Sequence, residues 1–180
     1  MKTAPIRAEN QQEADRTAQP ASWQHETEQS SPKVEKAKSP LQLLLVEDNK
    51  INQKITSQQL RKVGGYVVHI ADHGEECLEF LEKTIFCSKE TELSLILLDL
   101  EMPIMDGWTC ARKIRQRQRD GQFVGHVPII AVTANARPEQ IASAIEAGAD
   151  AVVTKPFRIL GLIPRIREVV KEVAQREQND

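Results

Sequence analysis

Five short apolar runs, separated by stretches with helical periodicity, constrain the fold of this chain most strongly. Each run is short enough to be a strand, and three are almost continuously apolar, as strands covered on both faces by helices require. The runs are LQLLLV (Leu41 to Val46), YVVHI (Tyr66 to Ile70), LSLILL (Leu93 to Leu98), VPIIAV (Val127 to Val132) and AVV (Ala151 to Val153). Five alternations of strand and helix predict an α/β domain with a parallel sheet, helices on both faces and right-handed crossovers.

The helical stretches begin and end at recognisable signals. The first is predicted to end at Gly64-Gly65, and its apolar stripe is Ile51, Ile55 and Leu60 or Val63. The last has the 4-3-4-3 spacing of a helical stripe, formed by Ile159, Ile163, Ile166, Val170 and Val173. Gly161 and Pro164 are tolerable only in or before the first turn of this last helix. The polar stretch from Thr84 to Leu93 is predicted to be an insertion before the third strand.

The beginning of the chain has a different composition. Residues 1–39 are rich in Gln, Glu, Lys, Ser and Ala and contain few large apolar side chains, so they cannot bury a core. We therefore predict a disordered arm or linker over residues 1–39, one folded domain over residues 40–176 and a short disordered tail over residues 177–180.

Composition excludes several classes of function. The 180 residues carry a formal net charge of −2, which provides no broad positive field for nucleic acid. No segment approaches the roughly 20 apolar residues of a membrane-spanning helix, and the polar start lacks the apolar core of a secretory signal. The predicted location is cytoplasmic or nuclear. The three cysteines lack metal or redox spacing and are interpreted as reduced thiols.

Polar side chains follow four of the predicted strands. Glu47-Asp48 follows the first, Asp99 the third, Thr133 the fourth and Lys155 the fifth. Parallel sheets of this kind bind ligands beyond the carboxyl ends of their strands, so these residues are expected to meet at one edge. Three carboxylates brought together repel one another, which either raises a pKa or favours a bound hard cation, and oxygen ligands with open positions suit Mg²⁺. A lysine and a hydroxyl opposite them complete a site for a phosphoryl group.

Four segments resemble a known family. LLLVEDNKINQ, LILLDLEMPIMDGW, PIIAVTANA and AGADAVVTKPF, in this order, are similar to the receiver domain of two-component response regulators and hybrid histidine kinases. The resemblance covers Leu41 to Val173. It implies a flavodoxin-like, doubly wound (βα)5 fold whose five-stranded parallel sheet has the order 2-1-3-4-5. It also implies that the chain accepts a phosphoryl group from a phosphohistidine and passes it on or switches conformation.

The resemblance also implies roles for individual residues. Asp99 matches the phosphoacceptor. Glu47 and Asp48 match Mg²⁺ ligands, with Asp99 itself and the backbone carbonyl of Glu101 completing the protein's share.

The remaining roles concern the other side of the site. Thr133 matches the hydroxyl that moves to the phosphoryl oxygen, and Lys155 matches the cation that pairs with it. Pro156 matches a proline preceded by a cis peptide bond. One position departs from the family pattern: receivers commonly carry Tyr or Phe three residues before the lysine, where this chain has Val152, so the aromatic part of the switch is in doubt. Asn135, like Glu101, occupies a position that tunes dephosphorylation in this family.

Three other functions fit the sequence less well. A phosphorylation-independent receiver-like scaffold is disfavoured by the complete set of acceptor, acids, threonine and lysine. A phosphatase that forms its own aspartyl phosphate is expected to have a DxD motif on its first strand and its acidic pair last, whereas here the acidic pair Glu47-Asp48 comes first. A flavin-binding protein needs a glycine- and hydroxyl-rich phosphate loop after the first strand, where this chain has Glu47-Asp48-Asn49.

The wider context is also a prediction. The sequence lacks the ATP-binding and histidine motifs of a kinase core, so whether the chain is an enzyme in its own right stays open. We expect either a stand-alone receiver or, preferably, the carboxy-terminal receiver of a hybrid histidine kinase. The partners implied are the phosphohistidine domain of a histidine kinase and a histidine phosphotransfer protein, docking around Asp99 and on the first helix, Ile51 to Val63.

Overall fold

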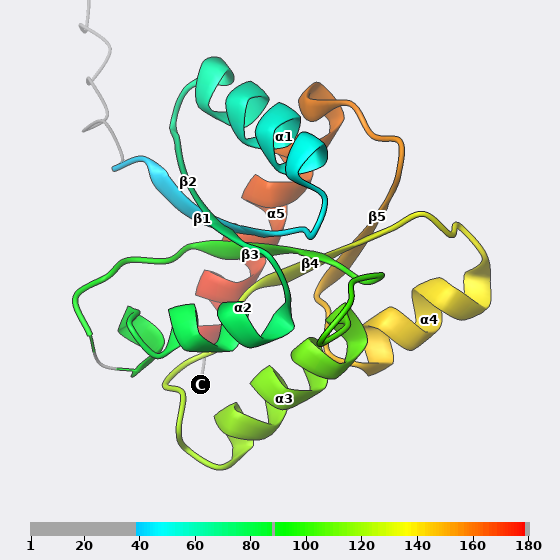
Figure 1. The fold of residues 1–180 in the computed structure, drawn as a ribbon. Coiled ribbons are helices and arrows are strands. Elements are labelled where there is room, and N and C mark those ends of the chain that lie inside the picture. The colour runs from blue at the N-terminus through cyan, green and yellow to red at the C-terminus, as the bar shows by residue number, and fades with distance from the viewer. Residues whose placement is uncertain (1–38, 88, 179–180) are drawn as a thin grey trace, which may run out of the picture. The chain divides into compact units, whose positions relative to one another are not determined.

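The computed structural model describes residues 39–87 and 89–178, which contain a five-stranded parallel sheet in the order β2-β1-β3-β4-β5 (Figure 1). The elements are β1 (Leu41–Val46), α1 (Lys50–Val63), β2 (Tyr66–Ala71), α2 (Gly74–Leu81), the 3-10 helix η1 (Ile85–Cys87), β3 (Leu95–Asp99), α3 (Gly107–Arg119), β4 (Ile129–Thr133), α4 (Pro138–Glu146), β5 (Ala151–Thr154) and α5 (Ile159–Glu177). This order confirms the predicted doubly wound α/β fold. The predicted arm lies outside the described residues, apart from Ser39.

Helices cover both faces of the sheet and create two apolar cores. One core contains alternate β-strand residues such as Leu44 and Leu98, together with side chains of α2, α3 and α4. The other contains Leu43, Leu97 and side chains of α1 and α5. Figure 1 shows α1 on one side of the sheet and α2, α3 and α4 on the other. The continuously apolar strands are therefore buried on both faces, as their sequence predicted.

The inward face of α1 differs from the predicted stripe. Ile51 and Ile55 are 69% and 48% exposed, whereas the buried residues of this helix are Gln53, Ser57 and Leu60. The prediction is confirmed for Leu60 but wrong for Ile51 and Ile55, because it assigned the inward face by hydrophobicity alone. Two polar side chains take that face, and one of them, Gln53, has hydrogen-bond partners inside the protein.

The last helix also differs from expectation. It begins at Ile159, so Pro164 lies in its second turn instead of in or before the first. Pro164 is exposed, while Leu162 and Ile166 on either side of it are buried against the sheet. Packing of these neighbours therefore outweighs the hydrogen bond that proline cannot donate. The helix includes Glu177, one residue of the predicted tail, whose carboxylate accepts a hydrogen bond from the His126 backbone.

The predicted insertion from Thr84 to Leu93 contains η1 and a parallel bridge between Thr84 and Thr91.

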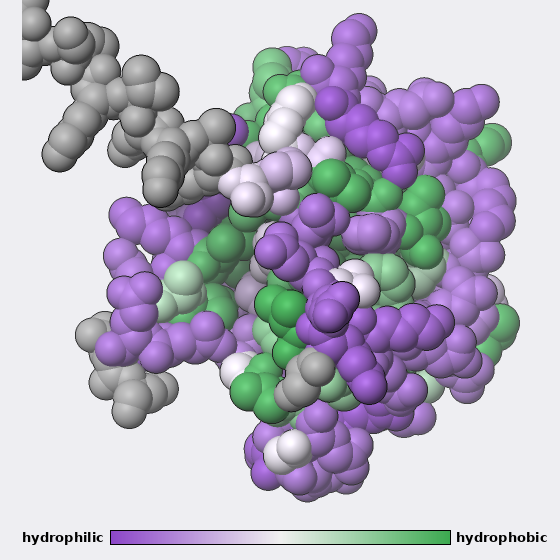
Figure 2. Space-filling model, turned by 90° about the vertical axis from the view of Figure 1, so that its left-hand side faces the viewer, coloured by the Kyte–Doolittle hydropathy of each residue, from purple (hydrophilic) through white to green (hydrophobic). Residues whose placement is uncertain are grey.

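The side of the molecule shown in Figure 2 is largely hydrophilic, with hydrophobic side chains gathered in its central part. All three cysteines are free. Among the described helices, none combines the length and apolar character needed to cross a membrane.

Candidate functional site

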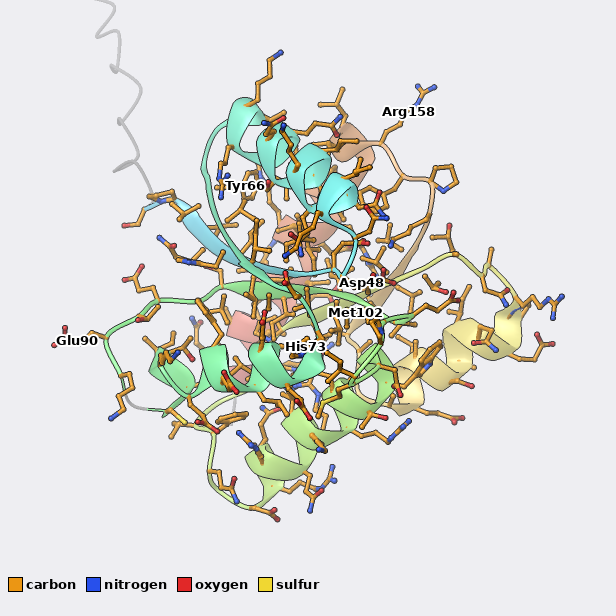
Figure 3. All side chains as sticks on the ribbon, viewed as in Figure 1. Asp48, Tyr66, His73, Glu90, Met102 and Arg158 are labelled. Atoms are coloured by element: carbon orange, nitrogen blue, oxygen red, sulfur yellow. The ribbon has the colours of Figure 1, made fainter. Side chains whose placement is uncertain are left out.

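The polar residues predicted to meet at one edge of the sheet are brought together by the strand order. Glu47 and Asp48 directly follow β1, Asp99 is the last residue of β3, Thr133 is the last residue of β4, and Lys155 directly follows β5. Because all five strands are parallel, these ends lie at the same edge. In Figure 3 the labels of Asp48 and of Met102, a residue of the β3–α3 loop, mark this end of the sheet.

Three carboxylates form a compact cluster at this edge. One oxygen from each of Glu47, Asp48 and Asp99 lies within 4.8 Å of the others. Glu47 and Asp99 are each only 5% exposed, whereas Asp48 is exposed. Burial in a medium of low dielectric constant makes the repulsion between such groups stronger than it is in water. The cluster therefore favours a bound cation, and its exposed member Asp48 keeps it open to solvent.

Lys155 neutralises part of this charge. Its Nζ lies 2.7 Å from Glu47 Oε2 and 2.5 Å from Asp99 Oδ2, so one ammonium joins the ends of β1, β3 and β5. Asp99 Oδ1 accepts a further hydrogen bond of 3.2 Å from the Glu101 N–H. Both oxygens of Asp99 are thus oriented by donors.

The ionisation of these groups reflects their burial. Burial raises the pKa of the Asp99 carboxyl, and the charge of Glu47 adds to this, although the Lys155 ammonium opposes both effects. Burial alone would lower the pKa of Lys155, but its hydrogen bonds to Asp99 and Glu47 raise it above the ordinary value. Lys155 therefore stays charged at neutral pH, and its single ammonium lies beside a cluster of three carboxyl groups, a set of oxygens to which a divalent cation is suited.

Thr133 is fully buried at the end of β4. Its Oγ1 accepts a hydrogen bond of 3.0 Å from the Asn135 N–H, which belongs to the β4–α4 loop. Asn135 Oδ1 in turn accepts from the Arg137 N–H, at 3.1 Å. The hydroxyl is therefore tied to the loop that leads into α4, and a movement of Thr133 would carry this loop with it.

The loop after β1 is fixed by the first turn of α1. Asn49 caps the helix, because its side chain accepts from the N–H groups of Ile51 and Asn52. Asn52 Nδ2 donates to Glu47 Oε1 at 3.0 Å, and Gln53 Nε2 donates to the Glu47 carbonyl oxygen. These amide groups were not predicted as part of the site. They lie within the motif LLLVEDNKINQ, but nothing in the sequence indicates that their side chains turn back to Glu47.

A close backbone contact supports Asp99 from the other side. Gly107, the first residue of α3, packs against the main chain of Asp99 and Leu100, and a Cβ at this position would overlap the Asp99 carbonyl oxygen. The Gly107 N–H donates to the Leu100 carbonyl oxygen at 3.0 Å. Glycine is required here because only its backbone can approach so closely.

The remaining predicted site residues are Glu101, Val152 and Pro156. Glu101 is exposed and contacts Asp99 through its N–H. Val152 is partly buried and packs against the core shared by α2, α3 and α4. The peptide bond between Lys155 and Pro156 is cis, the conformation that the family resemblance implies.

The fold and this edge together define a class: doubly wound proteins whose sheet carries an acid cluster, a threonine and a lysine at the ends of its strands. Comparison with known proteins agrees. The sequence matches the family model of the response regulator receiver domain over residues 43–167. The chain therefore belongs to the response regulator receiver family of two-component signalling.

Curated relatives carry this domain within much longer proteins. The peroxide stress-activated histidine kinase mak1 of Schizosaccharomyces pombe is 36% identical over 123 residues, which are 68% of this chain and 7% of that protein. The hybrid signal transduction protein dokA of Dictyostelium discoideum is 34% identical over 137 residues, or 76% of this chain and 7% of that protein. The chain thus spans a small fraction of the length of these relatives.

Solved structures share the fold. The receiver domain of the sensor histidine kinase PA1611 from Pseudomonas aeruginosa, described with a magnesium ion coordinated in its active site cleft, is 30% identical with a TM-score of 0.60. The match covers 73% of this chain and 98% of that one. A CheY-like receiver domain protein from Methanospirillum hungatei is 28% identical with a TM-score of 0.61, covering 77% and 99% of the two chains.

Proposed function

We propose that this domain accepts a phosphoryl group on Asp99 in a Mg²⁺-dependent reaction and thereby switches or relays a signal. The observation that carries the proposal is the position of the Asp99 carboxylate, which is buried within the acid cluster and contacts the Lys155 ammonium. A carboxylate held in this way is desolvated, oriented and close to cationic groups. These are the features that phosphoryl transfer requires.

The chemistry involves one bond made and one broken. An Asp99 carboxylate oxygen attacks the phosphorus of a phosphohistidine, the P–N bond breaks, and the histidine nitrogen leaves with the electron pair and takes up a proton. Lys155 compensates negative charge on the phosphoryl oxygens, and the Thr133 hydroxyl donates to one of them. Mg²⁺ supplies the remaining charge neutralisation when it is bound.

The donor set fits a magnesium ion. We assign Glu47, Asp48 and Asp99 as the carboxylates that hold it, directly or through water, with the carbonyl of Glu101 as a further oxygen ligand. Their clustered oxygens support this assignment. Mg²⁺ keeps several of its waters and takes the rest of its ligands from a few carboxylates and a phosphate.

Phosphorylation would change the surface through Thr133. The new group adds about −1.5 to −2 charge at a buried edge. Thr133 moving toward it would carry the β4–α4 loop with it through the hydrogen bond from the Asn135 N–H. Val152 offers no aromatic ring to follow this movement, so we expect the loop itself to report the phosphate.

The donor and recipient of the phosphoryl group would dock beside Asp99. Ile51 and Ile55 expose their side chains on α1, and a groove of about 310 Å³ between α1 and the β5–α5 segment reaches Lys155, with Ile55 and Phe157 among its lining residues. An apolar helix face next to the acceptor suits a helical histidine-bearing partner. We propose the phosphohistidine domain of a histidine kinase or a histidine phosphotransfer protein as this partner.

We extend the proposal to the whole protein. The similarity to hybrid kinases favours the receiver of a hybrid histidine kinase, with the kinase histidine as phosphoryl source. Because phosphohistidine is made from ATP, the domain would work on the cytoplasmic side. A phosphorylation-independent scaffold remains the competing function.

Phosphorylation by a small donor tests the proposal. The purified chain is incubated with acetyl phosphate, with and without Mg²⁺, and analysed on a phosphate-affinity gel. We expect a Mg²⁺-dependent shifted band that disappears in Asp99→Asn and persists in the matched control Asp120→Asn, an exposed aspartate at the end of α3. A chain that binds neither Mg²⁺ nor phosphate would support the scaffold.

A further inference from the structure

Gln53 is a polar residue at a position where a helix normally buries an apolar one. It faces the sheet from α1 and is only 5% exposed. Its side-chain amide reaches two groups on different loops. Nε2 donates to the main-chain carbonyl of Glu47 after β1 and, at 2.7 Å, to Asp72 Oδ1 after β2. A buried amide costs free energy unless it is hydrogen-bonded, so these two bonds fix its orientation.

The same residue holds the β1–α1 loop at both ends. The backbone N–H of Gln53 donates to the Asn49 carbonyl at 2.9 Å, while its side chain holds the Glu47 carbonyl. Asp48 is the only residue between these two anchors. Lys50 completes the arrangement, because its Nζ lies 2.5 Å from Asp72 and so braces the second acceptor of Gln53.

Asp48 itself has no such support. Within the described residues 39–87 and 89–178, no hydrogen bond or ion pair holds its carboxylate, which is exposed. The position of this carboxylate is therefore set by its main chain. The main chain is set in turn by the anchors at Glu47 and Asn49, and both anchors lead to Gln53.

We infer that Gln53 is a positioning residue that pre-arranges Glu47 and Asp48 for the divalent cation. The inference rests on the proposed function, since it concerns the metal site proposed above. Residues that orient metal ligands typically contribute 10- to 100-fold to metal affinity. Gln53 is suited to this role because it acts on the backbone of the ligand loop and leaves the ligand oxygens free.

Replacing Gln53 by methionine tests the hydrogen bonds of its side-chain amide separately from its packing. Gln53→Met keeps a straight side chain of similar length in the core but removes both hydrogen bonds. We expect the dissociation constant for Mg²⁺ to rise about tenfold. The matched control is Gln58→Met, on the exposed side of the same helix, which should bind Mg²⁺ as the unmodified chain does.

A second pair of variants tests the bond to Asp72. Gln53→Glu places a carboxylate against the Glu47 carbonyl and the Asp72 carboxylate, so Mg²⁺ affinity should fall at least as far as in Gln53→Met. Adding Asp72→Asn supplies an amide donor to the new carboxylate and should restore part of the affinity. Asp72→Asn alone still accepts from Gln53 but loses the ion pair with Lys50, so its Mg²⁺ affinity should lie between those of the unmodified chain and Gln53→Met.

Mg²⁺ binding is measured by Trp108 fluorescence in a Trp23→Phe background and, independently, by competition with Mn²⁺ followed by electron paramagnetic resonance. All variants are compared well below their thermal unfolding midpoints. Weakened binding in both Gln53 variants, with partial rescue by Asp72→Asn, supports the inference. A lowered unfolding midpoint with unchanged Mg²⁺ affinity assigns Gln53 to stability alone and overturns it. Absence of Mg²⁺ binding in the unmodified chain overturns the metal site and this inference together.

Discussion

Lys155 Nζ lies 2.5 Å from Asp99 Oδ2, although the strands that carry these residues are separated in the sheet by β4. The contact spans β4 at the sheet edge and continues to Glu47 after β1. A change in the charge or size of the Asp99 side chain therefore alters the contacts of Lys155, and with them the position of the segment between β5 and α5. Lys155 thus connects Asp99 to β5, a strand that does not pair with β3 in the sheet.

Removal of the Lys155 ammonium should destabilise the metal-free domain. Lys155→Met leaves Glu47 and Asp99 facing each other without a cation. We expect the free energy of unfolding to fall by roughly 2 kcal/mol at pH 7.5. The pKa of Asp99, already raised by burial, rises further, so the folded state gains relative stability when this carboxyl is protonated. The loss should therefore shrink toward pH 5. Urea unfolding at pH 7.5 and at pH 5 measures this loss of unfolding free energy, with Lys113→Met as the exposed control. An equal loss at the two pH values would show that protonation of Asp99 does not relieve the missing ammonium.

A methyl group at Gly107 should disturb both the fold and the acceptor. Gly107→Ala forces the start of α3 away from the Asp99 main chain and should cost about 2 kcal/mol. The yield of acetyl phosphate labelling should fall as well, because Asp99 shifts. Gly161→Ala is the matched control, since a Cβ there meets nothing within 4 Å, and its stability should be unchanged or raised by up to about 1 kcal/mol. Equal stability of the two variants would show that the close approach is unimportant.

Ile104 should be replaceable by glycine with a gain in stability. It adopts φ 68°, a conformation strained for a β-branched residue, and is 72% exposed, so its side chain contributes little packing. We expect Ile104→Gly to stabilise the domain by about 1 kcal/mol, measured by thermal unfolding. Val124→Gly, at another exposed loop position without positive φ, should destabilise it. A loss in both variants would indicate that the Ile104 backbone is not strained.

Asp150 should make stability depend on pH in the acid range. Its carboxylate lies 3.0 Å from Arg115 and 2.7 Å from His126 and accepts from the Ile129 N–H. Burial alone would raise its pKa, but these partners lower it below the ordinary value of 3.8. The stabilisation is thus complete above that value and is lost as pH falls through the lower folded-state pKa. Asp150→Asn should cost about 3 kcal/mol at pH 7.

The difference between Asp150→Asn and the unmodified chain should narrow below pH 4. Chemical unfolding across pH 3 to 7 follows it, with Asp120→Asn as the exposed control. A constant difference across this range would show that the Asp150 carboxylate carries no titrating stabilisation.

The sequence was sufficient to locate the main site residues. Buried strands are recognisable from continuous apolar runs, and the first polar residue after each run is fixed at one edge once the strands are parallel. Glu47, Asp48, Asp99, Thr133 and Lys155 could therefore be placed together before any coordinates. The bonds that Lys155 makes to two other strands could not, since they depend on side-chain conformations.

Buried polar residues escaped prediction because hydrophobicity does not mark them. Gln53 was not part of the predicted apolar stripe of its helix, whereas Ile51 and Ile55, which were, are exposed. Nothing in the sequence indicates a partner inside the fold for Arg115 or for His126. Both pair with Asp150. Such residues are inside because specific partners satisfy them, and partners distant in sequence are visible only in the fold.

Identification of the phosphorylated residue tests the central claim most directly. After incubation with acetyl phosphate and Mg²⁺, reduction with borohydride converts an aspartyl phosphate to homoserine, which peptide mass spectrometry locates in the sequence. We predict homoserine at position 99, dependent on Mg²⁺ and absent without the phosphoryl donor. Homoserine at position 48, reduction of the acyl phosphate at position 47, or no reduced residue in a chain that binds Mg²⁺ would contradict the assignment of Asp99 as the acceptor.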